Sequence, residues 1–304
     1  MTDKIAVLLP CYNEEKAISK VIKDFKKFLP EADIYVYDNN STDKTAELAK
    51  AAGAIVRREP MQGKGNVVRR MFADIDADIY VMSDGDETYD IQRAPELIQI
   101  LKENQLDMLV GARKEKEQEC YRSGHRFGNV LLTKLVQTFF NHQLKDMLSG
   151  YRVFSKRFVK TFPAQSLGFE IETELTVYAL SSKLPIQEVE TDYFARPEGS
   201  FSKLSTYKDG FRILKTIVTL IKEERPLLFF SLVALAFFML AFGLSIPIIA
   251  EYIKSGLVPR LPTAVFIMGI ATCGVLSLFA GFILDSISSA KKEARRQAYL
   301  KYKI

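Results

Sequence analysis

The chain has 304 residues, of which 26% are charged, and a formal net charge of +5. This length accommodates one domain of ordinary size plus a membrane hairpin, and no amino-terminal signal peptide is visible. The positive charge is concentrated beside two long apolar segments, which favours anionic lipid head groups over nucleic acid as the reason for it. The 3 cysteines lack a metal-ligand spacing and indicate a reducing cytosolic face.

Short apolar runs alternate with helical patterns from the start of the chain to Asp84. Residues 4–10, 33–37, 54–56 and 79–82 are the predicted strands. Polar loops follow these runs, and apolar residues then recur at helical spacing before the next run. This alternation predicts an α/β fold with a mostly parallel sheet, helices on both faces and the ligand at the carboxyl ends of the strands.

Two aspartates follow the last of these runs. Asp84 and Asp86 are separated by one glycine, and carboxylates at this spacing can share a divalent cation, which in turn can hold a diphosphate. An Asp-Gly-Asp turn is also common on protein surfaces, so the neighbouring motifs decide between the two interpretations. Neither G-x-G-x-x-G nor G-x-x-x-x-G-K-[ST] occurs, which leaves a dinucleotide fold and a P-loop unsupported. Gly63-Lys64-Gly65 is therefore interpreted either as a flexible loop that puts Lys64 near a phosphate or as an ordinary solvated turn.

Four motifs in this order resemble those of the family 2 glycosyltransferases with the GT-A fold. They are Pro10-x-Tyr12-Asn13-Glu14, Asp38-x-x-Ser41-x-Asp43-x-Thr45, Gly63-Lys64-Gly65 and Asp84-Gly85-Asp86. The resemblance implies a nucleotide-sugar donor bound by residues of these motifs, namely Pro10, Tyr12, Glu14, Asp38, Asp43, Lys64, Asp84 and Asp86. It also implies that Mg²⁺ or Mn²⁺ is held by Asp84 and Asp86.

Further motifs are similar to the polyprenyl-phosphate branch, which includes dolichol-phosphate mannose synthases and bacterial undecaprenyl-phosphate glucosyltransferases. They are Gly111-Ala112-Arg113, Arg126-x-x-Asn129, Asp146-x-x-Ser149-Gly150-Tyr151-Arg152 and Arg196-x-x-Gly199-Ser200-x-Ser202-Lys203. With the donor motifs, the resemblance covers roughly residues 4 to 225. The branch often has D-A-D-x-Q where this chain has Asp84-Gly85-Asp86-Glu87-Thr88, which leaves the third metal-side contact unassigned.

The reaction implied by the resemblance is attack of a polyprenyl-phosphate oxygen on the anomeric carbon of the nucleotide-sugar, with inversion. A phosphate monoester with a second pKa of about 6 is already largely dianionic at neutral pH, so this acceptor needs no general base. Guanidinium groups suit an anionic acceptor because they bind phosphate oxygens at two points and remain charged. A structural ion pair is the alternative role for each arginine.

The residues expected to act on the acceptor and in catalysis come from the same motifs. The acceptor phosphate is expected to contact Arg113, Arg126, Asn129 and Arg152. The expected catalytic residues are Asp86, Arg126, Arg152 and Lys203. An acidic cluster, Glu170, Glu172 and Glu174, is expected to orient arginines or the sugar.

Two nearly uncharged segments, residues 227–250 and 261–284, are each long enough to cross a hydrocarbon core, which needs about 20 helical residues. Two buried core helices are the alternative. The short connection between them predicts a tight hairpin, and its Lys254 and Arg260 are outnumbered by the basic residues that flank the spans. The positive-inside rule then places both termini and the catalytic domain in the cytoplasm, so a multi-pass protein of the inner (cytoplasmic) membrane is expected.

The segment before the first span has the pattern of an amphipathic helix, with Phe211, Leu214, Ile217, Val218 and Ile221 on one face. Such a helix can lie in the bilayer interface. An ordinary amphipathic helix packed on the domain is the alternative. The predicted organisation is a catalytic domain (1–204), an interfacial helix (205–226), the two spans (227–250 and 261–284) and a basic tail (285–304).

The sequence leaves the substrates open. A UDP-sugar is favoured by the resemblance to bacterial two-span members, with GDP-mannose as the alternative donor. A hydroxyl on another lipid or on a glycan is an alternative acceptor and would require a glutamate as base. A processive polysaccharide synthase usually carries a Q-x-x-R-W element, and this chain has no Trp. A non-catalytic nucleotide-sugar-binding membrane protein is the alternative from another class, against which the intact acidic and basic motifs argue; association into homo-oligomers is left open.

Overall fold

The computed structural model describes residues 3–115, 145–197 and 206–302. The chain divides into two compact units, residues 1–217 with 295–304 and residues 218–294, and each is described by itself. Three predicted site residues, Arg126, Asn129 and Lys203, lie outside the described residues.

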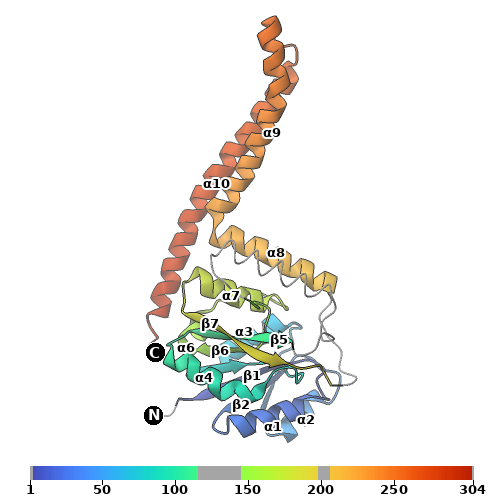
Figure 1. Ribbon diagram of the computed structural model, residues 1–304, viewed down its shortest axis with the longest axis vertical. Helices are drawn as coiled ribbons and strands as arrows, with labels where there is room; N and C mark the ends of the chain where they lie inside the picture. Colours follow the sequence, from blue (N-terminus) through green and yellow to red (C-terminus); the bar gives the residue numbers. More distant parts are fainter. Residues whose placement is uncertain (1–2, 116–144, 198–205, 303–304) are drawn as a thin grey trace. The chain divides into compact units, whose positions relative to one another are not determined.

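A seven-stranded sheet forms the centre of the first unit (Figure 1). Its strand order is β3-β2-β1-β4-β6-β5-β7, and β6 runs antiparallel to both of its neighbours while the remaining neighbours are parallel. The predicted α/β fold with a mostly parallel sheet is therefore confirmed. The strands are β1 Ile5–Cys11, β2 Asp33–Asp38, β3 Ile55–Arg58, β4 Ile79–Met82, β5 Met108–Glu115, β6 Arg152–Ser155 and β7 Ile186–Tyr193.

Helices cover both faces of the sheet, because alternate side chains of a strand point to opposite faces. In β1, Ala6 and Leu8 belong to one buried cluster and Val7 and Leu9 to the other. The first cluster includes side chains of α3 (Lys64–Asp74), α6 (Lys156–Thr161) and α7 (Ile171–Ser181). The second includes side chains of α1 (Ile18–Phe28), α2 (Thr45–Ala51), the 3₁₀ turn η1 (Ile91–Arg93) and α4 (Ala94–Glu103).

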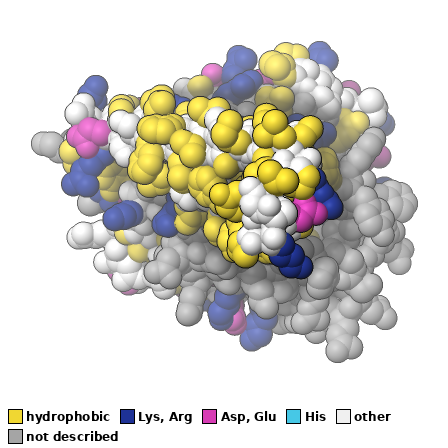
Figure 2. All heavy atoms as spheres, turned by 90° about the horizontal axis from the view of Figure 1, so that it is seen from above, with side chains coloured by type: hydrophobic (Ala, Val, Ile, Leu, Met, Phe, Trp, Pro, Cys, Tyr) yellow, Lys and Arg dark blue, Asp and Glu magenta, His cyan; other side chains and the backbone are white. Residues whose placement is uncertain are grey.

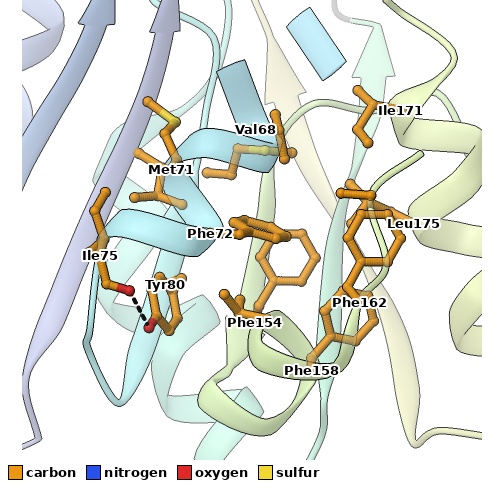
Figure 3. Close-up of a cluster of buried hydrophobic side chains, with 14 of the residues drawn as sticks. Val68, Met71, Phe72, Ile75, Tyr80, Phe154, Phe158, Phe162, Ile171 and Leu175 are labelled. Carbon is orange, nitrogen blue, oxygen red and sulfur yellow. Dashed lines mark hydrogen bonds between the residues drawn. The ribbon is translucent and has the colours of Figure 1, made fainter. Parts of the chain in front are cut away.

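Aromatic rings fill the centre of the first cluster (Figure 3). Phe72 of α3 meets Phe154 of β6 edge to face, with 5.6 Å between the ring centroids. Phe158 of α6 stacks on Phe154 at 4.9 Å. Each buried ring of this size contributes about 1.5–3 kcal/mol of hydrophobic free energy, so this layer is a main source of the sheet's stability.

The reversal of β6 brings a second loop to the edge where β4 ends. Met82, the last residue of β4, is paired with Arg152, the first residue of β6. The residues that precede β6 therefore lie beside those that follow β4. A Cβ atom added to Gly150 would lie 2.9 Å from Asp84 Oδ2, which shows how closely the two loops approach.

The last residues of the chain are part of the first unit. Tyr299 Oη donates a hydrogen bond of 2.8 Å to Asp107 Oδ2, and Asp107 is fully buried. The other oxygen of Asp107 accepts hydrogen bonds from Ser155 Oγ and from Arg157 Nε. The guanidinium of Arg157 also lies 4.8 Å from the centroid of the Tyr299 ring. The end of the predicted basic tail is thus fixed by a buried carboxylate.

The second unit contains the end of α8 (Thr206–Glu224) from residue 218, α9 (Pro226–Ser255) and the part of α10 (Leu261–Tyr299) that precedes residue 295. Both α9 and α10 are long and apolar enough to cross a membrane. They contain the predicted spans 227–250 and 261–284, and α10 continues as helix through most of the segment predicted as a tail. Their large apolar side chains are exposed, and Figure 2 shows such side chains in yellow over the hairpin.

Helix α8 (Thr206–Glu224) is amphipathic, but its apolar residues divide into two groups. Ile213, Ile217 and Ile221 are at most 4% exposed, so they pack against protein. Phe211, by contrast, is 71% exposed, and Leu214 and Val218 are exposed as well. Of the five residues predicted to share one face, Ile217 and Ile221 are therefore buried and the other three are exposed, and the location of this helix at a bilayer interface stays a prediction.

Candidate active site

The loops that follow β1 and β2 are tied together by side chains of the first two motifs. The backbone N–H of Asn13 donates to Ser41 Oγ at 2.9 Å, and the N–H of Glu14 donates to Thr45 Oγ1 at 2.7 Å. In the other direction, Asn13 Oδ1 accepts a hydrogen bond of 2.8 Å from the N–H of Thr42. Residues of the two motifs that were predicted to bind a donor, Pro10, Tyr12, Glu14, Asp38 and Asp43, are thereby held at one edge of the sheet.

The Gly-Lys-Gly segment, predicted as a flexible loop or a turn, forms the start of α3, since Gly63 precedes the helix and Lys64 and Gly65 begin it. The segment packs against the backbone of residues 166–167. Gly63 has φ +128°, and a Cβ atom there would lie 2.2 Å from the carbonyl oxygen of Leu167. A Cβ atom on Gly65 would lie 2.2 Å from the carbonyl oxygen of Ser166. Only glycine fits at either position, because a side chain would separate this loop from its support.

Two residues of the acidic cluster hold that supporting segment. Both carboxylate oxygens of Glu174 accept backbone hydrogen bonds, from Gln165 at 2.8 Å and Ser166 at 2.7 Å. Glu170 Oε1 accepts from the backbone N–H groups of Leu167 and Gly168. Glu170 and Glu174 therefore orient a loop in this structure, and their suggested role in orienting arginines or the sugar stays a prediction.

Lys64 lies between two carboxylates. Its Nζ is 2.5 Å from Asp84 Oδ1 and 2.5 Å from Glu172 Oε1. Burial by itself would lower the pKa of Lys64, but Asp84 and Glu172 outweigh it and raise the pKa above its ordinary value. Burial raises the pKa of Glu172, and the Lys64 ammonium opposes that shift. Lys64 is therefore a fixed positive charge at the end of β4.

Asp86 forms an ion pair with an arginine that follows β7. Arg196, three residues beyond β7, places Nη2 at 2.6 Å from Asp86 Oδ2. The Oγ1 hydroxyl of Thr88 donates to the other oxygen at 2.6 Å, and Asp86 is only 2% exposed. Burial and the neighbouring charge of Asp84 raise the pKa of Asp86, while Arg196 and Thr88 lower it.

Arg196 was not among the predicted site residues, although it opens the last motif that carried the resemblance. A signal was present in that motif, because an arginine close to the acidic turn suits an anionic ligand. What the sequence did not supply is the pairing of β5 with β7 and the bridge between Tyr89 and Tyr193, which bring the two segments together.

Arg152 is placed differently from the prediction. It is fully buried, and its guanidinium donates to the carbonyl oxygens of Ser149 (2.9 Å) and Met147 (2.6 Å) and to Thr176 Oγ1 (3.0 Å). Burial lowers the pKa of Arg152. The expected acceptor-phosphate and catalytic role is therefore corrected to a supporting one, because these donors are already used to shape the loop before β6.

Arg113 also has an internal partner. Its Nε and Nη2 lie 2.6 and 2.8 Å from the two oxygens of Asp146, a two-point ion pair between β5 and the same loop. This is the structural ion pair that the sequence left as the alternative. Gly150 in that loop donates its N–H to Tyr89 Oη at 2.8 Å. The D-x-x-S-G-Y-R motif is thus held in place by internal contacts and lies beside Asp84.

Asp84 and Asp86 would supply carboxylate oxygens to a divalent cation, with its remaining ligands coming from a bound molecule. Both carboxylates face an internal cation, Lys64 at Asp84 and Arg196 at Asp86, so positively charged groups already stand where a metal would be attracted. Within the described ranges, no group of three or more His, Cys, Asp or Glu side chains is placed to hold a metal ion. Oxygen ligands from a bound diphosphate would complete the coordination of Mg²⁺ or Mn²⁺.

The chain is similar to known proteins in sequence and in fold. The family model described as Glycosyl transferase family 2 matches residues 6–162. Glycosyltransferase AglJ of Haloferax volcanii is 31% identical over 299 residues, covering 97% of this chain and 97% of that protein. A dolichyl-phosphate hexose transferase of the same organism is 27% identical over 224 residues, covering 73% of this chain and 96% of that protein.

A solved structure shows a similar fold. It is glucosyl-3-phosphoglycerate synthase from Mycobacterium tuberculosis in complex with Mn²⁺, UDP-glucose and phosphoglyceric acid. The TM-score is 0.59 at 22% sequence identity, and the match covers 72% of this chain and 79% of that chain.

Proposed function

The chain belongs to glycosyl transferase family 2, and on this basis we propose that it transfers a hexose from a nucleotide-sugar to the phosphate of a polyprenyl phosphate. The observation that carries the proposal is the set of alternating charges at the end of β4, in which Lys64 and Arg196 contact Asp84 and Asp86. Such a set can accept a diphosphate and its counter-ion without creating an unpaired buried charge.

The proposed step breaks one bond and forms one. An oxygen of the acceptor phosphate attacks the anomeric carbon, the bond from that carbon to the diphosphate breaks, and the configuration inverts. The products are polyprenyl-phosphate-sugar and a nucleoside diphosphate. Because the attacking phosphate is already ionised, no side chain has to remove a proton.

The chain's own residues position the donor and balance its charge. Lys64 is held by Glu172 close to Asp84 and can contact a diphosphate oxygen without losing its second partner. Mg²⁺ or Mn²⁺ held by Asp84 and Asp86 would neutralise charge on the leaving diphosphate. The aspartates and Lys64 therefore remain the proposed donor and metal residues, together with Pro10, Tyr12, Glu14, Asp38 and Asp43 in the adjoining loops.

A lipid phosphate as acceptor is supported by two observations. The relative from Haloferax volcanii is named a dolichyl-phosphate hexose transferase, and the chain has two helices able to cross a membrane. Arg126, Asn129 and Lys203 stay proposed contacts of the acceptor and the diphosphate. We propose an inner-membrane location with both termini in the cytoplasm, and a UDP-sugar as donor.

The pairing of Glu172 with Lys64 argues against a hydroxyl acceptor. A hydroxyl would need a carboxylate that is free to take its proton, whereas Glu172 is within 2.5 Å of an ammonium group. The experiment below separates three alternatives. They are a lipid or glycan hydroxyl as acceptor, GDP-mannose in place of a UDP-sugar as donor, and nucleotide-sugar binding without turnover.

The test uses the full chain, purified in detergent. It is incubated with undecaprenyl phosphate, Mg²⁺ or Mn²⁺ and a panel of UDP- and GDP-sugars, and lipid-linked sugar is followed by mass spectrometry. We expect product from one donor, lost after chelation with EDTA and in Asp86→Ala. Asp76→Ala, which removes a mostly exposed aspartate that pairs with Lys156, is the matched control and should keep full activity. Donor binding without lipid product would contradict the proposed acceptor.

A further inference from the structure

We propose that Arg196 takes the place of the divalent cation at Asp86 in the donor-free enzyme, and moves to the diphosphate when donor and cation bind together. The inference rests on the donor half of the proposed function. It assigns to Arg196 the role of a positioning residue that couples the binding of the two ligands.

Access to Asp86 is limited by its present partners. One oxygen is 2.6 Å from Arg196 Nη2 and the other accepts a 2.6 Å hydrogen bond from Thr88. The Asp86 side chain is 3% exposed, so a cation cannot add to it from open solvent while both contacts persist. Thr88 is two residues away in the same turn and contacts Asp86 through a neutral hydroxyl. The guanidinium is the partner that an incoming cation has to displace, because two positive charges would otherwise share one carboxylate.

Arg196 is better suited to exchange than the neighbouring Lys64. If a cation displaces Lys64 from Asp84, the Lys64 ammonium still has its ion pair with Glu172. Arg196 forms an ion pair with Asp86, and its Nη1 atom is buried without a hydrogen-bond partner among the described residues. A buried guanidinium nitrogen without an acceptor costs free energy, and a diphosphate oxygen would supply that acceptor.

The backbone around Arg196 is anchored, so the exchange needs only a movement of its side chain. The N–H of Phe194 donates to the carbonyl oxygen of Thr88 at 2.9 Å. Tyr193 forms an antiparallel bridge with Tyr89. The end of β7 is thereby fixed to the turn that carries Asp86, and the guanidinium stays within reach of any ligand of that turn.

The expected behaviour follows from linkage. A cation that arrives alone has to break the pair between Arg196 and Asp86 and leaves the guanidinium without its ion-paired carboxylate. A cation that arrives with a nucleoside diphosphate gives the guanidinium a new anionic partner. The two ligands should therefore bind cooperatively, and removal of the guanidinium should weaken that cooperativity.

The test measures Mn²⁺ binding to the detergent-purified full chain by electron paramagnetic resonance, with and without UDP. In Arg196→Gln we expect Mn²⁺ alone to bind about tenfold more tightly than in the wild type, and the enhancement by UDP to fall by a similar factor. Arg70→Gln is the matched control, because it removes an arginine that pairs with Asp74 on the exposed face of α3. Its two affinities should equal those of the wild type.

Arg196→Lys keeps a positive charge and should retain part of the coupling, which provides a second reading if the glutamine variant does not fold. Unchanged Mn²⁺ affinity and unchanged UDP enhancement in folded Arg196→Gln would overturn the inference and leave the proposed function standing. Absence of Mn²⁺ and UDP binding in the wild type would overturn the donor half of the proposed function, and the inference with it.

Discussion

Glu172 and Lys64 form an ion pair of 2.5 Å in which both side chains are at least nine-tenths buried. Breaking such a pair on one side leaves an uncompensated buried charge, which costs about 3–5 kcal/mol. We expect Lys64→Met to destabilise the protein by about 3 kcal/mol, and the double variant Lys64→Met/Glu172→Leu to recover part of that loss. Thermal unfolding of Lys64→Met, Glu172→Leu and the double variant in detergent gives the coupling free energy between the two residues. Additive losses would show that the two residues do not depend on each other.

The Gly-Lys-Gly loop should not tolerate a methyl group. In Gly65→Ala the new Cβ atom would lie 2.2 Å from the Ser166 carbonyl oxygen, and the backbone has to shift. We expect a loss of about 1–3 kcal/mol in unfolding free energy and a weaker interaction with the donor. Gly210→Ala is the matched control: no atom lies within 4 Å of its added Cβ, and alanine should stabilise α8 by about 0.5–1 kcal/mol. Equal effects at both positions would contradict the packing described above.

The supporting role of Arg152 can be separated from a role in phosphate binding. Arg152→Lys cannot reproduce the three hydrogen bonds that the buried guanidinium donates, so we expect a loss of about 2–4 kcal/mol in stability. The loop before β6 should become more mobile, and the position of Asp84, which lies beside that loop, should become less well fixed. A variant with wild-type melting temperature but weaker binding of the acceptor would instead return Arg152 to the acceptor site.

The hydrogen bond between Tyr299 and Asp107 predicts that the end of the chain stabilises the domain. Tyr299→Phe removes a hydroxyl bound to a buried carboxylate and should cost about 1.5–3 kcal/mol. Tyr302→Phe alters an exposed tyrosine three residues further on and should have almost no effect. Both are measured by thermal unfolding, and equal melting temperatures of Tyr299→Phe and the wild type would refute the contact.

The proposed topology can be tested with single cysteines placed in a chain whose own cysteines are replaced by alanine. Leu257→Cys lies in the short connection between α9 and α10, and Lys301→Cys lies near the end of the chain. On intact cells, a maleimide that cannot cross membranes should label Leu257→Cys only. Lys301→Cys should become reactive after permeabilisation, and labelling in the reverse order would invert the proposed orientation.

Much of the first unit could be predicted because strand, loop and helix follow one another along its sequence. The strands around Val7, Val36 and Val81 were identified from short apolar runs, and the structure confirms the mostly parallel sheet. The antiparallel strand that starts at Arg152 was not identified as a strand. Its pairing with Met82 and Val110 depends on contacts between residues far apart in sequence, which local patterns do not encode.

For the candidate site, the motifs indicated which residues follow the strands, and the structure places Lys64 beside Asp84. The donor and metal roles of Asp84, Asp86 and Lys64 stay predictions. The role of Arg152 could not be predicted from sequence, because the same motif is compatible with an arginine that supports a loop and with one that binds a phosphate. The pairing of Arg196 with Asp86 could not be predicted from local patterns either, because the two residues are 110 positions apart in the sequence.

The burial of Arg152 affects how β6 is aligned with β4. Arg152 and Phe154 lie on the same face of the sheet, and Val153 lies on the opposite face in the second hydrophobic cluster. A slip of one residue against β4 would exchange these faces and force the guanidinium among apolar side chains, away from every carbonyl oxygen it now reaches. The arginine thus disfavours alignments shifted by one residue, and it helps to keep the residues before β6, including Gly150, beside Asp84.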